Sequence, residues 1–228
     1  MNLLGALLLA GAAPAHVPFV GCAADGQAGP VPAPRARPMP VVPAAAARAL
    51  AWYASENEAV LAPRGWRCFQ TYGSNGGTLV VAPQPLNFDL IQGRGISFRG
   101  PIVVSSTSVG GTSGRFEVIY PIARYFPAHH NFIQRVRNMG FELEPLPRGP
   151  YPTDRIVSRT PTEIRLITPP GRRGEGTNFL LAPNRDPVDS LIVLHPGTDP
   201  DVSTLTIRLP RDQRALTPVI IAAARRRR

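Results

Sequence analysis

Proline and glycine are the residues that most constrain how this chain folds. The 228 residues include 27 prolines and 21 glycines, about a fifth of the total. Proline fixes φ and lacks the backbone donor, so it ends helices and is confined to sheet edges and turns. Hydrophobic residues still make up 43% of the sequence, which is typical of a globular chain. We therefore expect a folded protein of short elements joined by many turns and irregular segments.

The remaining composition excludes several classes of enzyme. All 25 basic residues are arginine, so a Walker A loop and a Schiff-base lysine are excluded. Two cysteines cannot fill a cysteine-rich zinc site or an iron–sulfur cluster. Gly93-Arg94-Gly95 lacks the third glycine of a dinucleotide-binding loop. We find no catalytic signature and expect neither a cofactor nor a metal, since no EF-hand spacing relates Asp186, Asp189, Asp199 and Asp201.

The beginning of the chain is typical of a secretory signal peptide. Residues 3–15 (LLGALLLAGAAPA) carry no charge. This run is too short to span a membrane but has the length of a signal-peptide apolar region. Ala13 and Ala15 are the small residues that a signal peptidase reads. We interpret residues 1–15 as a signal peptide and expect a periplasmic or secreted protein without a later transmembrane span. The alternatives are a buried N-terminal helix and a lipoprotein cleavage box at residues 19–22.

The two cysteines, Cys22 and Cys68, predict one disulfide bond, because exported chains meet an oxidising compartment. This bond would attach a proline-rich N-terminal segment, residues 16–43, to the rest of the protein. Six prolines between residues 30 and 43 favour an extended, polyproline-like linker there. Trp66 lies close to Cys68 in sequence, and we expect it to be mostly buried against the disulfide.

Residues 44–224 predict a single α+β domain, followed by a basic tail at residues 225–228. The pattern favours a largely antiparallel sheet of about six to seven strands with three to four short helices. Pro121 leaves residues 116–126 open between one helix and a strand followed by a helix that begins at Pro121. Helices are otherwise expected over residues 44–54, 128–139 and 215–224. Strands are expected over residues 66–72, 78–82, 96–98, 102–106, 155–159, 163–168, 189–195 and 204–209.

Several short blocks resemble a family of exported proteobacterial proteins of unknown function. They are residues 62–69 (APRGWRCF) with residues 72–74 (YGS), the surroundings of Cys22, and residues 112–116, 149–152 and 208–210. Pro121 departs from the family pattern. This family has no known activity, so the resemblance implies none. The Pro-Arg-Gly-Trp entry into a strand also resembles the PsbP-like fold, which implies an α/β/α sandwich with helices on both faces of a sheet.

The candidate catalytic residues are few. A serine hydrolase needs a serine on a sharp turn beside a histidine and an acid. Ser113, in Gly-Thr-Ser-Gly-Arg, lacks the usual final glycine, so it is more simply a helix cap. We therefore favour an exported accessory or binding protein of the bacterial envelope. The alternative is a serine hydrolase-like enzyme that uses Ser113 or Ser74 with His129, His130 or His195.

The net charge of +10 favours attraction to an anionic partner. The candidate anion-binding residues are Arg172 and Arg173 in a glycine-rich loop, and Arg225, Arg226, Arg227 and Arg228 in the tail. We expect the tail to be extended and solvated, because no acidic residue lies beside it in sequence. The expected partner is an anionic envelope surface. Nucleic acid is not expected, since aromatic residues are few and the arginines are scattered.

Overall fold

The structure is a computed structural model and describes residues 14–93 and 97–226. Most of the predicted signal peptide, residues 1–13, lies outside the described residues. The same is true of Ile96 in one predicted strand and of Arg227 and Arg228 in the tail. Phe98, from that predicted strand, forms an isolated β-bridge with Leu181.

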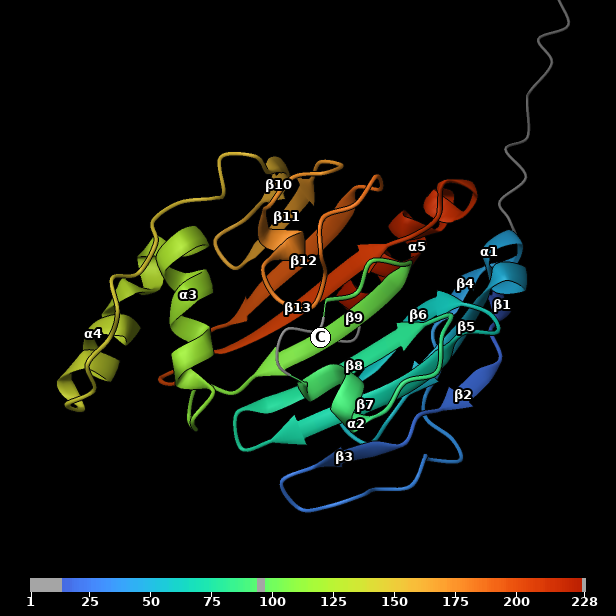
Figure 1. Cartoon of the computed structure of the whole chain (residues 1–228), viewed down its shortest axis with the longest axis horizontal. Helices are drawn as coiled ribbons and strands as arrows, with labels where there is room; N and C mark the ends of the chain where they lie inside the picture. The colour runs from blue at the N-terminus through green and yellow to red at the C-terminus, as the bar shows by residue number, and fades with distance from the viewer. Residues whose placement is uncertain (1–13, 94–96, 227–228) are drawn as a thin grey trace, which may run out of the picture.

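One large sheet lies at the centre of the protein (Figure 1). In order across the sheet, its strands are β10 (Arg155–Arg159), β11 (Glu163–Thr168), β12 (Val188–His195), β13 (Asp201–Arg208), β9 (Ile102–Ser108), β8 (Gly76–Ala82), β7 (Arg67–Gly73) and β3 (Ala24–Gly26). Neighbouring strands are antiparallel, except that β3 runs parallel to β7. The α+β class and the largely antiparallel sheet are therefore confirmed. The described sheet has eight strands rather than six or seven, because the N-terminal segment supplies β3.

Two smaller sheets involve the N-terminal third of the chain. One has the order β2 (Phe19–Gly21), β5 (Leu50–Ala54) and β6 (Ala59–Pro63). The other pairs β1 (Pro14–His16) with β4 (Val41–Pro43). The predicted N-terminal tether is thus wrong in part, because its strands are integral to these sheets and to the large one. Residues 32–40 have no regular strand or helix, as expected for a proline-rich stretch.

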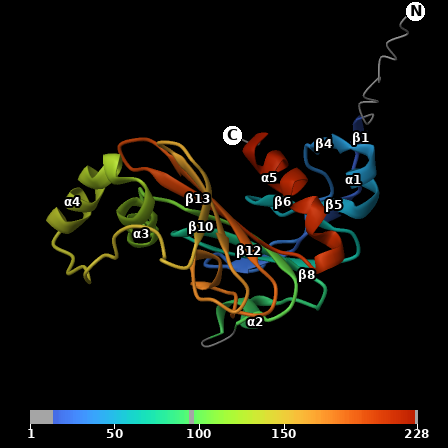
Figure 2. The same cartoon turned by 90° about the horizontal axis from the view of Figure 1, so that it is seen from above.

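The helices lie around the large sheet (Figure 2). The α-helices of the described residues are α1 (Ala44–Ala49), α2 (Phe88–Gln92), α3 (Arg115–Tyr125), α4 (His130–Asn138) and α5 (Thr217–Arg226). Short 3-10 helices are η1 (Pro127–His129), η2 (Glu175–Thr177) and η3 (Arg211–Leu216). α2 was not predicted from the sequence; Asn87 caps it by accepting a hydrogen bond from the Leu90 N–H at 2.9 Å.

The two faces of the large sheet are covered differently, because successive residues of a strand point to opposite faces. Leu79, Val81 and Val103 face one way and pack with β5, β6 and α5 in the largest apolar cluster. Val80 and Val104 face the other way, into a cluster that includes α2 and residues 180–181. On this second face a separate cluster buries α3 and α4 against β11, β12 and β13. Two apolar clusters therefore share the second face.

The predicted helix over residues 44–54 is wrong in its second half. α1 ends at Ala49, and residues 50–54 form β5, in which every residue is buried. β5 lies between β2 and β6 and pairs with both. Trp52 and Tyr53 favour a strand, and pairing on both sides outweighs the helical preference of the alanine-rich sequence before them.

Pro121 lies inside α3, so a single helix spans the region that the sequence left open. A proline in a helix interior removes one hydrogen bond and costs about 3 kcal/mol. The helix buries Val118, Ile119, Ile122 and Tyr125, and full burial of one such aliphatic side chain contributes about 1.5–3 kcal/mol. Packing therefore offsets the cost of the proline. The alternative of a strand before Pro121 is wrong.

The predicted boundary between the last helix and the basic tail is also wrong. α5 continues through Arg225 and Arg226. The Arg225 Nε donates to Oε1 of Glu163 at 3.0 Å, and its Nη2 forms an ion pair with the same carboxylate. Glu163 is distant from Arg225 in sequence, so the residues next to the tail do not indicate that the two side chains meet. These two arginines are not an extended, unpaired tail.

Arg208, at the end of β13, is fully buried. Its Nε donates to the carbonyl of Gly100 at 2.9 Å and its Nη1 to that of Ala182 at 2.7 Å. Its Nη2 donates to the carbonyl of Phe98. Burial lowers the pKa of this guanidinium, and nearby Asp186 acts in the opposite direction. The side chain therefore joins two loops to the end of the central sheet.

Candidate functional site

A cavity of about 920 Å³ lies over the second face of the large sheet. This volume is within the usual range of small-molecule sites. Its floor is formed by β7, β8, β9 and β13. Its walls come from α2, α3, and the segments around Tyr151 and Phe179. The cavity is therefore flanked by the two apolar clusters that share this face.

The floor of the cavity is lined by hydroxyl groups. Thr71 lies opposite Thr78, Thr78 opposite Ser106, and Ser106 opposite Thr204 in the strand register. These four residues form a row, which we call the hydroxyl row, across four neighbouring strands. Strands are about 4.8 Å apart, so the row is about 14 Å long. Thr206 adds a further hydroxyl beside it.

Among the described residues, three of the four hydroxyls of the hydroxyl row lack a side-chain partner. Thr71 accepts a hydrogen bond from Nε2 of Gln92 at 2.9 Å. Within residues 14–93 and 97–226, the hydroxyls of Thr78, Ser106 and Thr204 form no side-chain hydrogen bond. Their residues are half-buried. Hydroxyls in such a position are normally paired with protein or water. These three have no side-chain partner, so a ligand can supply one.

Aromatic side chains stand on the walls of the cavity and are unusually exposed. Tyr120 is 44% exposed, Phe88 37% and Phe179 67%. They come from α3, α2 and the segment before Leu180, so distant parts of the chain bring them to one cavity. Exposed aromatic rings gathered at a concave surface are a feature of recognition sites, because they provide large contact areas at low entropic cost.

Among residues 14–93 and 97–226, three charged side chains line the cavity: Glu117, Arg124 and Glu175. Glu117 accepts hydrogen bonds from Ser108 Oγ and Asn75 Nδ2, both at 2.7 Å. The Arg124 guanidinium lies 3.9 Å above the centre of the Tyr151 ring, in a cation–π contact. Its Nη1 also donates to the carbonyl of Gly149 at 3.0 Å. Glu117 and Arg124 are thus held in place before any ligand arrives.

The surroundings of Glu175 shift the pKa of its carboxyl group. Its Oε2 accepts a hydrogen bond from the hydroxyl of Tyr125 at 2.5 Å, and its Oε1 accepts one from Asn178 at 3.1 Å. Burial raises the pKa of Glu175 above its ordinary value; Asp154 acts in the same direction, while the two hydrogen bonds and Arg124 oppose it. The pKa of Tyr125 is also raised, mainly by burial and then by the neighbouring carboxylate.

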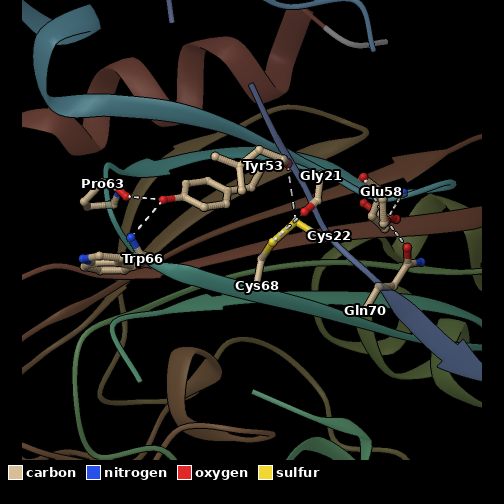
Figure 3. The surroundings of a disulfide bond; sticks show 10 residues. Gly21, Cys22, Tyr53, Glu58, Pro63, Trp66, Cys68 and Gln70 are labelled. Atoms are coloured by element: carbon tan, nitrogen blue, oxygen red, sulfur yellow. Dashed lines mark hydrogen bonds between the residues drawn. A yellow bond between two sulfur atoms is a disulfide. The ribbon is translucent and has the colours of Figure 1, made fainter. Parts of the chain in front are cut away.

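The predicted disulfide is confirmed. Cys22 and Cys68 are bonded, with their Cα atoms 5.4 Å apart (Figure 3). The bond lies away from the cavity, and neither cysteine lines it. Trp66 is half-buried rather than mostly buried, although it packs against the largest apolar cluster. Its backbone N–H donates to the hydroxyl of Tyr53 at 3.0 Å. The other tryptophan, Trp52, is the buried one.

The predicted serine–histidine pairings do not form. The hydroxyls of Ser74 and Ser113 lie 2.9 Å from each other, and in the described parts of the chain neither contacts a histidine. Ser113 does not cap α3, whose N-cap is Gly114. Nε2 of His195 instead lies 2.9 Å from Oγ of Ser203. Neither residue of that pair lines the cavity.

The remaining candidate residues lie apart from one another. Arg172 and Arg173 are exposed in the loop before η2, whereas Arg225 and Arg226 belong to α5. Three of the four aspartates considered for calcium have separate partners, and Asp199 is exposed in the loop between β12 and β13. Asp186 pairs with Arg214, Asp189 pairs with Arg165, and Asp201 accepts a hydrogen bond from the Gly110 N–H. No group of three or more His, Cys, Asp or Glu residues close enough for a metal occurs in the described residues.

Sequence reasoning missed the cavity. One signal was present: residues 105–108 (SSTS) and residues 203–206 (STLT) place hydroxyls on a face that is apolar further along the same strands. Among the described residues, no helix is long and apolar enough to cross a membrane. Comparison with protein-family models, curated proteins and solved structures found no match to this chain.

Proposed function

We propose that this protein is a non-catalytic binding protein that holds a ligand in the cavity over the large sheet. The observation that carries the proposal is the set of unpaired hydroxyls on the floor. A folded chain normally covers a sheet face with apolar packing, as both ends of this face are covered. A hydroxyl-lined hollow between those clusters leaves part of the face without apolar burial. A ligand that fills the hollow would explain why this part of the face is left uncovered.

The same proposal places the protein in the bacterial envelope, as an exported accessory protein. The disulfide between Cys22 and Cys68 supports this location, because such bonds persist in oxidising compartments. The resemblance of its sequence blocks to exported proteins points the same way. The PsbP-like arrangement stays a prediction. The serine hydrolase alternative is less well supported, since the His195–Ser203 pair lies outside the cavity.

A cavity-filling variant tests the proposal. Ser106 is the central residue of the floor, and Ser106→Trp would place an indole in the cavity. Thr198→Trp is the matched control, because Thr198 is exposed in the loop between β12 and β13 and does not line the cavity. The protein would be dialysed against a small-molecule and oligomer extract of bacterial envelopes, and retained compounds identified by mass spectrometry.

We expect the parent protein and Thr198→Trp to retain at least one compound that Ser106→Trp does not. Circular dichroism would establish that both variants fold. If no compound is retained, or if Ser106→Trp retains the same compounds as the parent protein, the cavity is not a binding site.

A further inference from the structure

The chemistry of the cavity specifies a class of ligand. A hydroxyl group both donates and accepts hydrogen bonds. The free hydroxyls of Thr78, Ser106 and Thr204 therefore fit a ligand whose own polar groups do the same. They also repeat at the spacing of the strands, about 4.8 Å, along the hydroxyl row. A ligand that lies across the strands would meet one such group at each step.

The aromatic walls add a second requirement. Tyr120, Phe88 and Phe179 offer exposed rings above the hydroxyl floor. Such rings favour ligands with apolar C–H surfaces, because they bury large areas without ordering many bonds. A ligand that satisfies both floor and walls must carry hydroxyls along its edges and C–H groups on its faces. Sugar rings have this arrangement.

The charges of the cavity argue against an anionic ligand. Two carboxylates, Glu117 and Glu175, line it together with one arginine, Arg124. Glu117 already accepts two hydrogen bonds, and the Arg124 guanidinium is held against Tyr151. A phosphate would be repelled by the Glu117 carboxylate. Among the described residues that line the cavity, the arginine it would meet is Arg124, which is already held against Tyr151. A neutral ligand has no such penalty.

The floor also argues against a fatty acyl chain. An alkyl chain over Thr78, Ser106 and Thr204 would remove water from three hydroxyls and offer them no partner, which is unfavourable. We propose that the ligand is a neutral, linear oligosaccharide that lies across the strands and pairs its hydroxyls with the hydroxyl row. The length of one sugar unit is close to the strand spacing, so the row accommodates about three units. This inference rests on the proposed binding function.

Calorimetric titration of the full, processed protein with defined probes tests the ligand class. The probes are neutral linear oligosaccharides of the cello-, malto- and N-acetylated chito-series, from two to six units long. Dodecanoate, inorganic phosphate and trialanine represent an acyl chain, an anion and a peptide. We expect at least one oligosaccharide series to bind, with affinity rising from two to about three units and then levelling off.

Shape-conserving variants then test the hydroxyl row. Thr204→Val removes one hydroxyl and should weaken oligosaccharide binding about fivefold, the value of one ordinary hydrogen bond. Phe179→Ala should also weaken it. Ile156→Ala is the control, because Ile156 is also an exposed apolar residue, but it lies on β10 outside the cavity. It should bind as the parent protein does.

The outcomes separate the two proposals. If dodecanoate, phosphate or trialanine binds the parent protein but not Ser106→Trp, and no oligosaccharide binds, the ligand class is wrong while the binding function stands. If oligosaccharides bind equally well to Thr204→Val, Phe179→Ala and Ser106→Trp, they bind elsewhere and the inference is wrong. If no probe binds and the envelope extract also yields no retained compound, both proposals fail.

Discussion

Arg208→Met should lower the free energy of unfolding by about 2–3 kcal/mol. The substitution keeps an unbranched apolar stem but removes the guanidinium, whose three nitrogens donate these hydrogen bonds. The carbonyl of Phe98 keeps the hydrogen bond that it accepts from the Ala182 N–H at 3.1 Å. The carbonyls of Gly100 and Ala182 lose the side-chain donors that now bind them. Each unpaired buried carbonyl costs about 1–3 kcal/mol.

Two unpaired carbonyls at this cost would together lower the free energy of unfolding by about 2–6 kcal/mol. Two effects place the expected loss at the low end of this range. Gly100 and Ala182 are only half-buried, so water reaches their carbonyls in part. Methionine also avoids the cost of burying a charged guanidinium, and replacement of buried ionic groups by apolar ones is sometimes neutral or stabilising. Here the loss prevails, because the partners of Arg208 are backbone carbonyls that the substitution leaves behind.

Urea unfolding followed by circular dichroism measures the effect directly. Arg208→Lys serves as the comparison, since it keeps the charge but presents a single ammonium group that cannot span three carbonyls. We expect it also to be less stable than the parent protein. A parent-like or higher stability of Arg208→Met would refute the reasoning, since it would show that the hydrogen bonds only repay the desolvation of the guanidinium.

Three further predictions concern the disulfide, the buried carboxyl and the last helix. Replacing both Cys22 and Cys68 with serine should lower the free energy of unfolding by about 4 kcal/mol, given their separation of 46 residues. A loss below about 1 kcal/mol in urea unfolding would mean that strand pairing alone orders the N-terminal segment. The raised pKa of Glu175 means that the native state binds its proton more tightly than the unfolded chain does, so stability should fall as pH rises from the ordinary glutamate pKa through the raised one. Glu175→Gln should flatten that part of the stability–pH curve and should not destabilise the protein at neutral pH; an unchanged curve would contradict the assignment. Deletion of residues 225–228 should lower the free energy of unfolding by less than about 1 kcal/mol, because the side chain that pairs with Glu163 is 42% exposed. The deletion should also reduce binding to anionic vesicles, and the binding of the parent protein should weaken as salt is raised. A deletion that leaves vesicle binding intact would exclude an anionic surface contact by the tail.

The candidate site could be predicted from the sequence only in pieces. The hydroxyls of Ser106 and Thr204 are visible in the sequence, and Tyr120 falls in a predicted element. Their approach to one another depends on the pairing of β9 with β13, whose residues are about a hundred positions apart. Pairing register at such a distance has no local signature. The serine–histidine hypothesis failed because the fold places Ser74 and Ser113 against each other, while His195 lies beside Ser203 on the next strand of its own hairpin.

Local chemistry was sufficient for the features that depend on near neighbours. The hairpin of β7 and β8 follows from its glycine-rich turn, where Gly76 has φ of +136° and a Cβ would lie 1.8 Å from the carbonyl oxygen of Thr107. The hairpins of β10 with β11 and of β12 with β13 follow from alternating patterns around short turns. The disulfide follows from the cysteine count and the expected compartment.

Long-range packing settled the features that local propensity left open or predicted wrongly. Residues 50–54 are a strand because β2 and β6 pair with them on both sides. Pro121 remains inside a helix because that helix buries an apolar face against β12 and β13. Arg225 is paired because folding brings Glu163 to it. In each case part of the decisive energy comes from groups distant in the sequence, which are β2 for residues 50–54, β12 and β13 for Pro121, and Glu163 for Arg225. Only the folded arrangement brings them into contact.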